Sequence, residues 1–265
     1  MKKRRTTIIS AFLFLLLFAG GAGAQIAGNP VASSGTKEWT VGLSSTYFYQ
    51  TIGRELTTAN RFLLKSGWGV FPWLDLYVMG GASNLKMDRR DDYTISDYSD
   101  KYRFAYGGGV NALVGDKLQL WFGANAMRFK SRGNFTEPLL ITGQTYIKRF
   151  EMNYDWREFK GYLGIAFNIG SFTFYGAGAG WYLWRIESKD EYRDGNGSVS
   201  YIGHDEGEYS SGLYTGAIVG IEMKLPQRYT ITLEALLFNE RNLQIMAGIS
   251  QTGWQKMEPI EEWDE

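Results

Sequence analysis

Residues 37–51 read KEWTVGLSSTYFYQT and alternate in character with a period of two. One face is apolar and consists of Trp39, Val41, Leu43, Tyr47 and Tyr49. The other face is small or polar and includes Thr40, Gly42, Ser44 and Thr46. Successive side chains of a β-strand point to opposite faces, so this stretch predicts a strand with one apolar side.

Similar alternating stretches recur along the chain. We predict strands over 37–51, 60–70, 74–83, 102–114, 118–129, 149–167, 172–186, 213–222, 229–235 and 243–249. No helical stretch among them could cover their apolar faces, which indicates lipid contact from a closed barrel. The sequence therefore predicts an all-β fold, a transmembrane antiparallel up-and-down β-barrel of about ten strands. Eight strands and a soluble β-sandwich are the alternatives, and the many aromatic residues near strand ends disfavour the sandwich.

The connections between these strands are of two kinds. Short turns are expected at 71–73, 115–117, 168–171, 226–228 and 239–241. Three longer charged stretches, 86–101, 130–148 and 187–210, are predicted to be loops. Outer-membrane barrels have short periplasmic turns and longer outer loops, so the tight turns and both chain ends are expected in the periplasm.

The two ends of the chain differ from the region between them. Residues 1–24 have a basic start, a short apolar run and small residues before Gln25, the pattern of a cleaved signal peptide. Residues 25–36 are expected to be a flexible periplasmic leader, 37–254 the barrel and 255–265 an acidic periplasmic tail. The predicted location is the outer membrane of a Gram-negative bacterium.

Composition excludes several classes of site. The chain has no cysteine, which rules out disulfides, thiolate metal sites, a cysteine nucleophile and a lipid-anchored amino-terminal cysteine. Removal of the four basic residues of the signal peptide leaves a mildly acidic mature chain, so no nucleic-acid partner is expected. No other stretch approaches the roughly 20 apolar residues that a transmembrane helix needs.

The polar faces of the predicted strands carry charges of both signs. The inward charges are expected to be Arg61, Lys65, Asp75, Glu158, Lys160, Glu222 and Glu234. Tyr77, Trp121 and Tyr162 are expected on the same inner face. A ten-stranded lumen is narrow, so these groups should pair across it and plug the barrel. A narrow pore lined by both signs is the alternative.

Over residues 37–254 the chain resembles the small bacterial outer-membrane β-barrel proteins. The stretch Phe104-Ala105-Tyr106-Gly107-Gly108-Gly109-Val110 and the closing hairpin 234–249 carry the strand pattern common in that group. The resemblance is architectural, so it implies a fold and a location rather than an activity.

One ten-stranded family, the omptin proteases, is catalytic and places a pair of Asp residues opposite an Asp and a His on its outer rim. This sequence offers Asp91 with Asp92, and His204 with Asp205. The omptin pattern has one residue between the members of each pair, whereas both pairs here are adjacent. Adjacent side chains of a strand point to opposite faces and do not converge on one water molecule. No other catalytic or phosphate-binding motif is present.

The stretch 187–210 also contains oxygen ligands that suit a hard cation. They are Asp190, Asp194, Asn196, Asp205 and Glu206, whose spacing does not match an EF-hand. We expect neither a bound metal nor a cofactor, because acidic surface stretches are usually solvated.

These observations predict a monomeric barrel, structural or narrowly pore-like, that is not an enzyme. Its expected partners are outer-membrane lipid and lipopolysaccharide, with small solutes or ions if the lumen is open. Two alternatives remain: an outer-membrane hydrolase that uses the rim residues, and a binding or adhesion barrel that acts through the three long charged stretches.

Overall fold

The computed structural model describes residues 38–52, 55–91, 94–141, 144–195, 198–238 and 242–253. Its elements are β1 (Trp39–Ile52), β2 (Glu55–Phe71), β3 (Leu74–Ser83), β4 (Lys86–Asp91), β5 (Thr94–Ser99), β6 (Arg103–Gly115), β7 (Leu118–Ile141), β8 (Gln144–Ile169), β9 (Phe172–Gly195), β10 (Ser198–Lys224), the 3-10 turn η1 (Pro226–Arg228), β11 (Tyr229–Phe238) and β12 (Asn242–Thr252). The predicted signal peptide 1–24, leader 25–36 and tail 255–265 lie outside the described residues.

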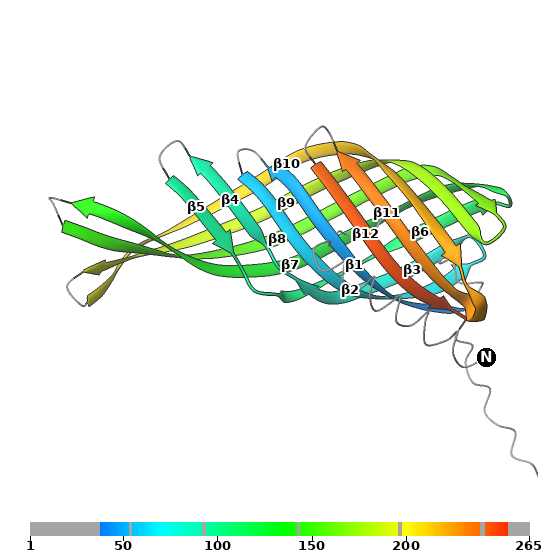
Figure 1. Cartoon of the computed structure of the whole chain (residues 1–265), viewed down its shortest axis with the longest axis horizontal. Helices are drawn as coiled ribbons and strands as arrows, with labels where there is room; N and C mark the ends of the chain where they lie inside the picture. The colour runs from blue at the N-terminus through cyan, green and yellow to red at the C-terminus, as the bar shows by residue number, and fades with distance from the viewer. Residues whose placement is uncertain are drawn as a thin grey trace, which may run out of the picture.

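The strands form a closed antiparallel ring (Figure 1). β1 pairs with β2 on one side and with β12 on the other, which joins the first and last strands of the sheet. Every other strand around the ring pairs with its neighbour in the chain, apart from the interruptions described next. The prediction of an up-and-down barrel is confirmed.

Twelve strand segments fill ten positions in this ring because two positions are interrupted. β2 pairs with β3 as far as Arg61 and Ser83, and then with β4 from Thr58 and Lys86. Asn84 bridges that interruption: the backbone N–H of Asn60 donates to Asn84 Oδ1 at 2.6 Å. β5 and β6 share the next position in the same way, since β4 pairs with β5 and β3 pairs with β6. The number of positions is therefore ten, as predicted.

Side chains alternate between a buried inner face and an exposed apolar outer face. Each position around the ring contributes large exposed apolar side chains, for example Leu43, Leu64, Val78, Phe104, Leu120, Leu163, Phe174, Val219, Leu233 and Ile245. Stacked aromatic pairs lie near the short turns, Trp39 with Trp68 and Phe71 with Trp73. This exterior is typical of barrels that meet lipid, with aromatic rings at the headgroup level.

No helix among the described residues is long and apolar enough to cross a membrane.

The prediction of loops at 86–101, 130–148 and 187–210 is wrong for most of the described residues, which form β-hairpins instead. β4 and β5 occupy most of the first stretch, while β7 and β8 pair as far as Ile141 and Gln144. β9 and β10 pair as far as Gly195 and Ser198. Charge is compatible with a strand whose outer face meets water, and the inner face still buries Phe150, Met152 and Tyr154.

These long strands run past the rest of the barrel (Figure 1). Phe129, Trp156, Arg185 and Tyr209 are register partners on four consecutive strands. We call the parts of β7 to β10 beyond this row the extension. β9, for example, continues from Arg185 to Gly195, which is about 30 Å at roughly 3.3 Å per residue.

Candidate functional site

The structure places all seven predicted interior charges in the barrel lumen. Their exposed fractions range from 0 to 8%, for Arg61, Lys65, Asp75, Glu158, Lys160, Glu222 and Glu234. Tyr77, Trp121 and Tyr162 are also buried. Period-two alternation points each of these side chains into the lumen. Burial at this level requires each charge to find partners.

Arg61 and Glu158 form a bidentate ion pair across the lumen. Arg61 Nη1 and Nη2 donate to the two carboxylate oxygens of Glu158 at 3.2 and 2.5 Å. The indole N–H of Trp156 donates to the same carboxylate. β2 and β8 are four positions apart in the ring, so a direct contact between their side chains requires a narrow lumen.

Further polar contacts cross the interior between other strands. Lys160 Nζ donates to Gln244 Oε1 at 3.0 Å, from β8 to β12. Tyr175 donates its hydroxyl to Glu234 Oε2 at 3.1 Å, from β9 to β11. β8 and β12 are four ring positions apart, so the Lys160–Gln244 bond crosses the lumen. The Tyr175–Glu234 bond spans only β10, which lies between β9 and β11.

A second group of charges surrounds Lys65. Its ammonium lies 4.0 Å from the centroid of the Tyr77 ring, a cation–π contact. Asp75, Glu222 and Glu234 all interact electrostatically with Lys65. Thr232 donates its hydroxyl to Glu222 Oε1 at 3.3 Å. One ammonium faces three acidic side chains in this part of the lumen, so Lys65 offsets only part of their negative charge.

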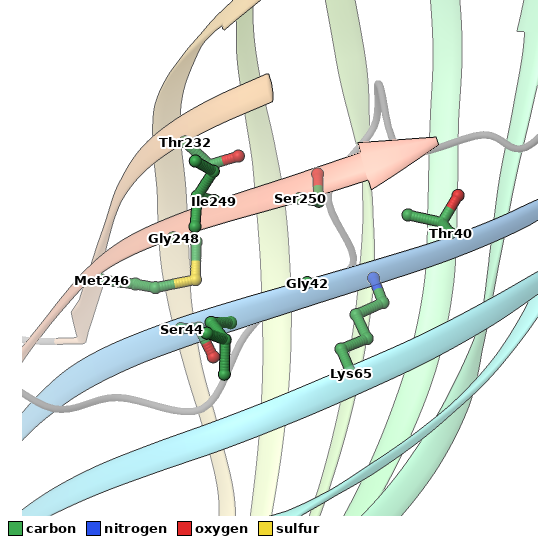
Figure 2. A pocket seen from close by; sticks show the side chains of 10 residues that line it. Thr40, Gly42, Ser44, Lys65, Thr232, Met246, Gly248, Ile249 and Ser250 are labelled. Carbon is green, nitrogen blue, oxygen red and sulfur yellow. The ribbon is translucent and has the colours of Figure 1, made fainter. Parts of the chain in front are cut away.

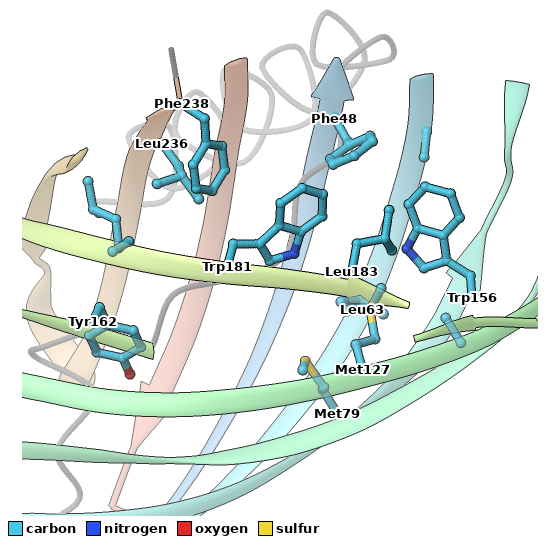
Figure 3. Close-up of a cluster of buried hydrophobic side chains, with 14 of the residues drawn as sticks. Phe48, Leu63, Met79, Met127, Trp156, Tyr162, Trp181, Leu183, Leu236 and Phe238 are labelled. Atoms are coloured by element: carbon cyan, nitrogen blue, oxygen red, sulfur yellow. The ribbon is translucent and has the colours of Figure 1, made fainter. Parts of the chain in front are cut away.

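Aromatic side chains gather in the lumen (Figure 3). The Arg61 guanidinium, which is paired with Glu158, lies against the rings of Phe48 and Phe129. Phe48 packs edge-on against Trp156 and Trp181, with ring centroids 6.0 and 5.8 Å apart. Trp181 also contacts Phe238 at 5.5 Å, and Phe129 contacts Trp156 at 5.8 Å. We call Phe48, Phe129, Trp156, Trp181 and Phe238 the aromatic layer; each is at most 1% exposed.

The aromatic layer was not predicted from the sequence. The signal that was available is in residues 181–185, where Trp181, Leu183 and Arg185 occupy alternate positions and are all buried. Since an arginine on a lipid face is costly, Arg185 could have marked this face as the inner one.

One small cavity opens between β1 and β12 (Figure 2). It measures about 30 Å³ and is lined in part by Thr40, Ser44, Lys65, Thr232 and Met246. This volume accommodates a water molecule or two. It is far too small for a channel that carries hydrated ions.

The rim residues named from the sequence are held differently. Asp91 ends β4, where it pairs with Thr94, and Asp92 lies outside the described residues. His204, on β10, contacts Asp190 Oδ1 through Nδ1 at 2.7 Å and Glu206 Oε1 through Nε2 at 3.1 Å. Asp205 follows on the opposite face of the strand.

Hydrogen bonds to Asp190 and then to Glu206 raise the pKa of His204 above its ordinary value of 6.5. The Glu206 contact was visible in the sequence, because residues two apart share a face of a strand. The Asp190 contact depends on the register of β9 against β10, in which Asp190 is the partner of His204.

The described oxygen side chains that were considered as cation ligands do not assemble. Asp190 and Glu206 are engaged with His204, and Asp205 lies on the other face. Asn196 and the side chain of Asp194 lie outside what the structure describes. Across the described ranges no three His, Asp or Glu side chains are grouped so as to hold a metal ion.

No family model and no curated protein matches this sequence. Among solved structures, the chain is similar to the outer-membrane protease OmpT of Escherichia coli, with 11% identity over 86% of this chain and 99% of that one, at a TM-score of 0.40. It is also similar to the transport unit of the Escherichia coli autotransporter AIDA-I, with 12% identity over 91% and 97% of the two chains and a TM-score of 0.38. The translocator domain of Neisseria meningitidis NalP matches at 7% identity over 95% and 96%, with a TM-score of 0.36.

Proposed function

We propose that the protein is an integral barrel of the bacterial outer membrane that is closed to solutes and presents its extension outside the cell. The aromatic layer, together with the Arg61–Glu158 pair, is the observation that carries this proposal. A lumen filled at one level by buried rings and a direct ion pair leaves no continuous aqueous path.

The orientation follows from the lengths of the connections. The tight turns lie at one end of the barrel and the long hairpins at the other, and outer-membrane barrels keep their longer segments outside. The apolar outer face around the ring supports insertion in lipid. The part available to an external partner is then the extension, which favours surface binding or adhesion over transport.

We further propose that the barrel is monomeric, surrounded by outer-membrane lipid, and not catalytic. His204 is engaged by Asp190 and Glu206 on one face of β10, while Asp205 lies on the other. This arrangement gives little support to a hydrolase built on Asp91, Asp92, His204 and Asp205. Peptidase or lipase activity that disappears in a His204→Ala variant would favour the hydrolase instead.

Planar-bilayer conductance tests the closed lumen. The refolded mature chain, checked by heat-modifiable gel mobility, should insert and show no discrete conductance steps. Trp156→Ala/Trp181→Ala should produce steps, because it removes two rings from the aromatic layer. Trp39→Ala/Trp68→Ala removes two exposed outer-face rings and should remain silent.

Discrete steps in the wild-type protein would contradict the proposal. If their ion selectivity also changed on Lys65→Met substitution, the narrow-pore alternative would replace it. Should the double tryptophan variant fail to fold, the single change Trp181→Leu keeps the test available with a smaller loss of packing.

A further inference from the structure

We propose that the outward face of β7, β8 and β9, just beyond the apolar band, binds the phosphate groups of an outer-leaflet lipid. This inference rests on the proposed membrane location and orientation. The site is formed by Arg128, Lys130, Arg132, Asp155 and Arg157, with Trp184 beneath Arg157.

Strand register places these residues at the border of the apolar surface. Ala126, Phe159 and Tyr182 are partners across β7, β8 and β9, and Phe159 and Tyr182 are 54% and 39% exposed. The next outward-facing row is Arg128, Arg157 and Trp184. Basic side chains therefore begin where the lipid-facing side chains end, at the level expected for headgroups.

A shared carboxylate holds the two arginines in place. Arg128 donates to the Asp155 carboxylate through Nε at 2.8 Å and through Nη2 at 2.6 Å. Arg157 Nη2 donates to the same carboxylate at 2.8 Å. The Arg157 guanidinium also lies 4.7 Å from the centroid of the Trp184 ring. Side chains fixed in this way lose little conformational entropy when an anion binds.

The cluster retains positive charge. Two guanidinium groups against one carboxylate leave one charge in excess, and Lys130 and Arg132 continue the outward row of β7. Burial would raise the pKa of Asp155, but the hydrogen bonds from Arg128 and Arg157 lower it to about 2. Asp155 thus stays ionised and continues to hold both arginines at neutral pH.

A hollow lies directly beyond the arginine row. It measures about 460 Å³, and its lining includes Lys130, Arg132, Asn153, Asp155, Ile186 and Ser188. This volume is in the range of small-ligand sites. Its basic side chains suit a phosphate, and Asn153 and Ser188 add neutral hydrogen-bonding groups.

Acidic side chains border the site, among them Glu151, Glu206 and Glu208, which is the register partner of Ile186. Glu206 also lines the hollow, from the β10 side. Glu151 accepts from Arg132 Nη2 at 2.9 Å, but the Arg132 side chain is 61% exposed. Exposed ion pairs of this kind are weak, so a phosphate can compete for Arg132.

The test uses the refolded mature protein in phosphatidylcholine nanodiscs that contain a small fraction of diphosphorylated or dephosphorylated lipid A. Native mass spectrometry counts the retained lipid A molecules. We expect selective retention of the phosphorylated form. Lys130→Gln/Arg157→Gln should weaken this retention roughly 30-fold, since each basic residue near an anionic surface contributes substantially to binding.

The double variant leaves the Arg128–Asp155 pair intact, so the local structure should persist. Lys117→Gln/Lys224→Gln removes two exposed charges at the short-turn end and should retain phosphorylated lipid A like the wild type. If the first double variant does not fold, Lys130→Gln/Arg132→Gln changes two exposed side chains of the same site.

Equal retention of both lipid A forms, or equal losses in the site and control variants, would overturn the lipid site. Gel mobility and insertion are read on the same samples. A protein that inserts without this selectivity therefore refutes only the lipid site, whereas a protein that does not insert refutes the proposed barrel function itself.

Discussion

Single charged side chains in the lumen depend on partners from distant strands. Arg61 lies between the Phe48 and Phe129 rings, 5.3 and 5.4 Å from their centroids, and is paired with Glu158. Removing one member of a buried ion pair leaves an uncompensated charge, which costs more than the pair itself contributes. The lumen charges are therefore constraints on packing as well as candidates for function.

His204 gives a direct test of the geometry at the rim. It is the sole histidine of the chain, so its NMR signal is unambiguous. We expect its titration midpoint to lie above 6.5, because Asp190 and then Glu206 bind the protonated ring. Asp190→Asn should lower the midpoint, and Asp205→Asn, on the opposite face, should change it much less.

The sign of the pH effect follows from the raised pKa. The contacts to His204 contribute fully to the stability of the folded protein below the pKa that this histidine has in the unfolded chain. This contribution is lost as the pH rises through the pKa of His204 in the folded protein. A midpoint that responds to Asp205→Asn as strongly as to Asp190→Asn would show that the register of β9 and β10 is different.

At the scale of the strands, glycines make room for inward tyrosines on neighbouring strands. Tyr77 lies against Gly109, Tyr162 against Gly123 and Tyr175 against Gly220. A Cβ at Gly220 would lie 2.2 Å from Cζ of Tyr175. The ring occupies the space that a side chain on β10 would otherwise fill.

Gly220→Ala should therefore destabilise the barrel by about 1 to 3 kcal/mol, the usual cost of overpacking. The added methyl displaces Tyr175 and with it the hydrogen bond to Glu234. Gly207→Ala is the matched control on the same strand, where a Cβ meets no atom within 4 Å. Denaturant unfolding in detergent measures both, and equal stabilities would contradict the tight packing of Tyr175.

At the scale of the whole molecule, the extension continues four of the strands that form the barrel, but its strands have different neighbours. The barrel part of β10 pairs with both β9 and β11. Beyond Gly216, the described pairing of β10 is with β9 alone. Closure of the ring thus supports the barrel, whereas the extension depends on pairing among β7, β8, β9 and β10.

We expect the barrel to fold without the distal part of the longest hairpin. Glu187 and Gly207 are register partners, so residues 188–206 can be replaced by an Asn-Gly turn without a shift in register. The shortened protein should keep its heat-modifiable mobility and remain electrically silent. Loss of the heat-modifiable form would mean that the extension is part of the folding unit.

The sequence alone determined the strand fold, the ten ring positions and the inner face of most strands. Alternation of side chains is a local property of an extended backbone, so Arg61 and Glu158 could each be placed inside from their own neighbours. The lengths of β7 to β10 were underestimated, because charge on a water-facing strand resembles the composition of a loop.

Only the tertiary structure decided which of these side chains meet. The contact of Arg61 with Glu158, of His204 with Asp190, and of Phe48 with Trp181 joins residues from different strands. Such contacts depend on register and on the width of the closed ring, which arise from pairing between segments far apart in the chain. The proposed closure of the lumen is therefore a property of the assembled barrel, because it depends on how side chains from different strands pack.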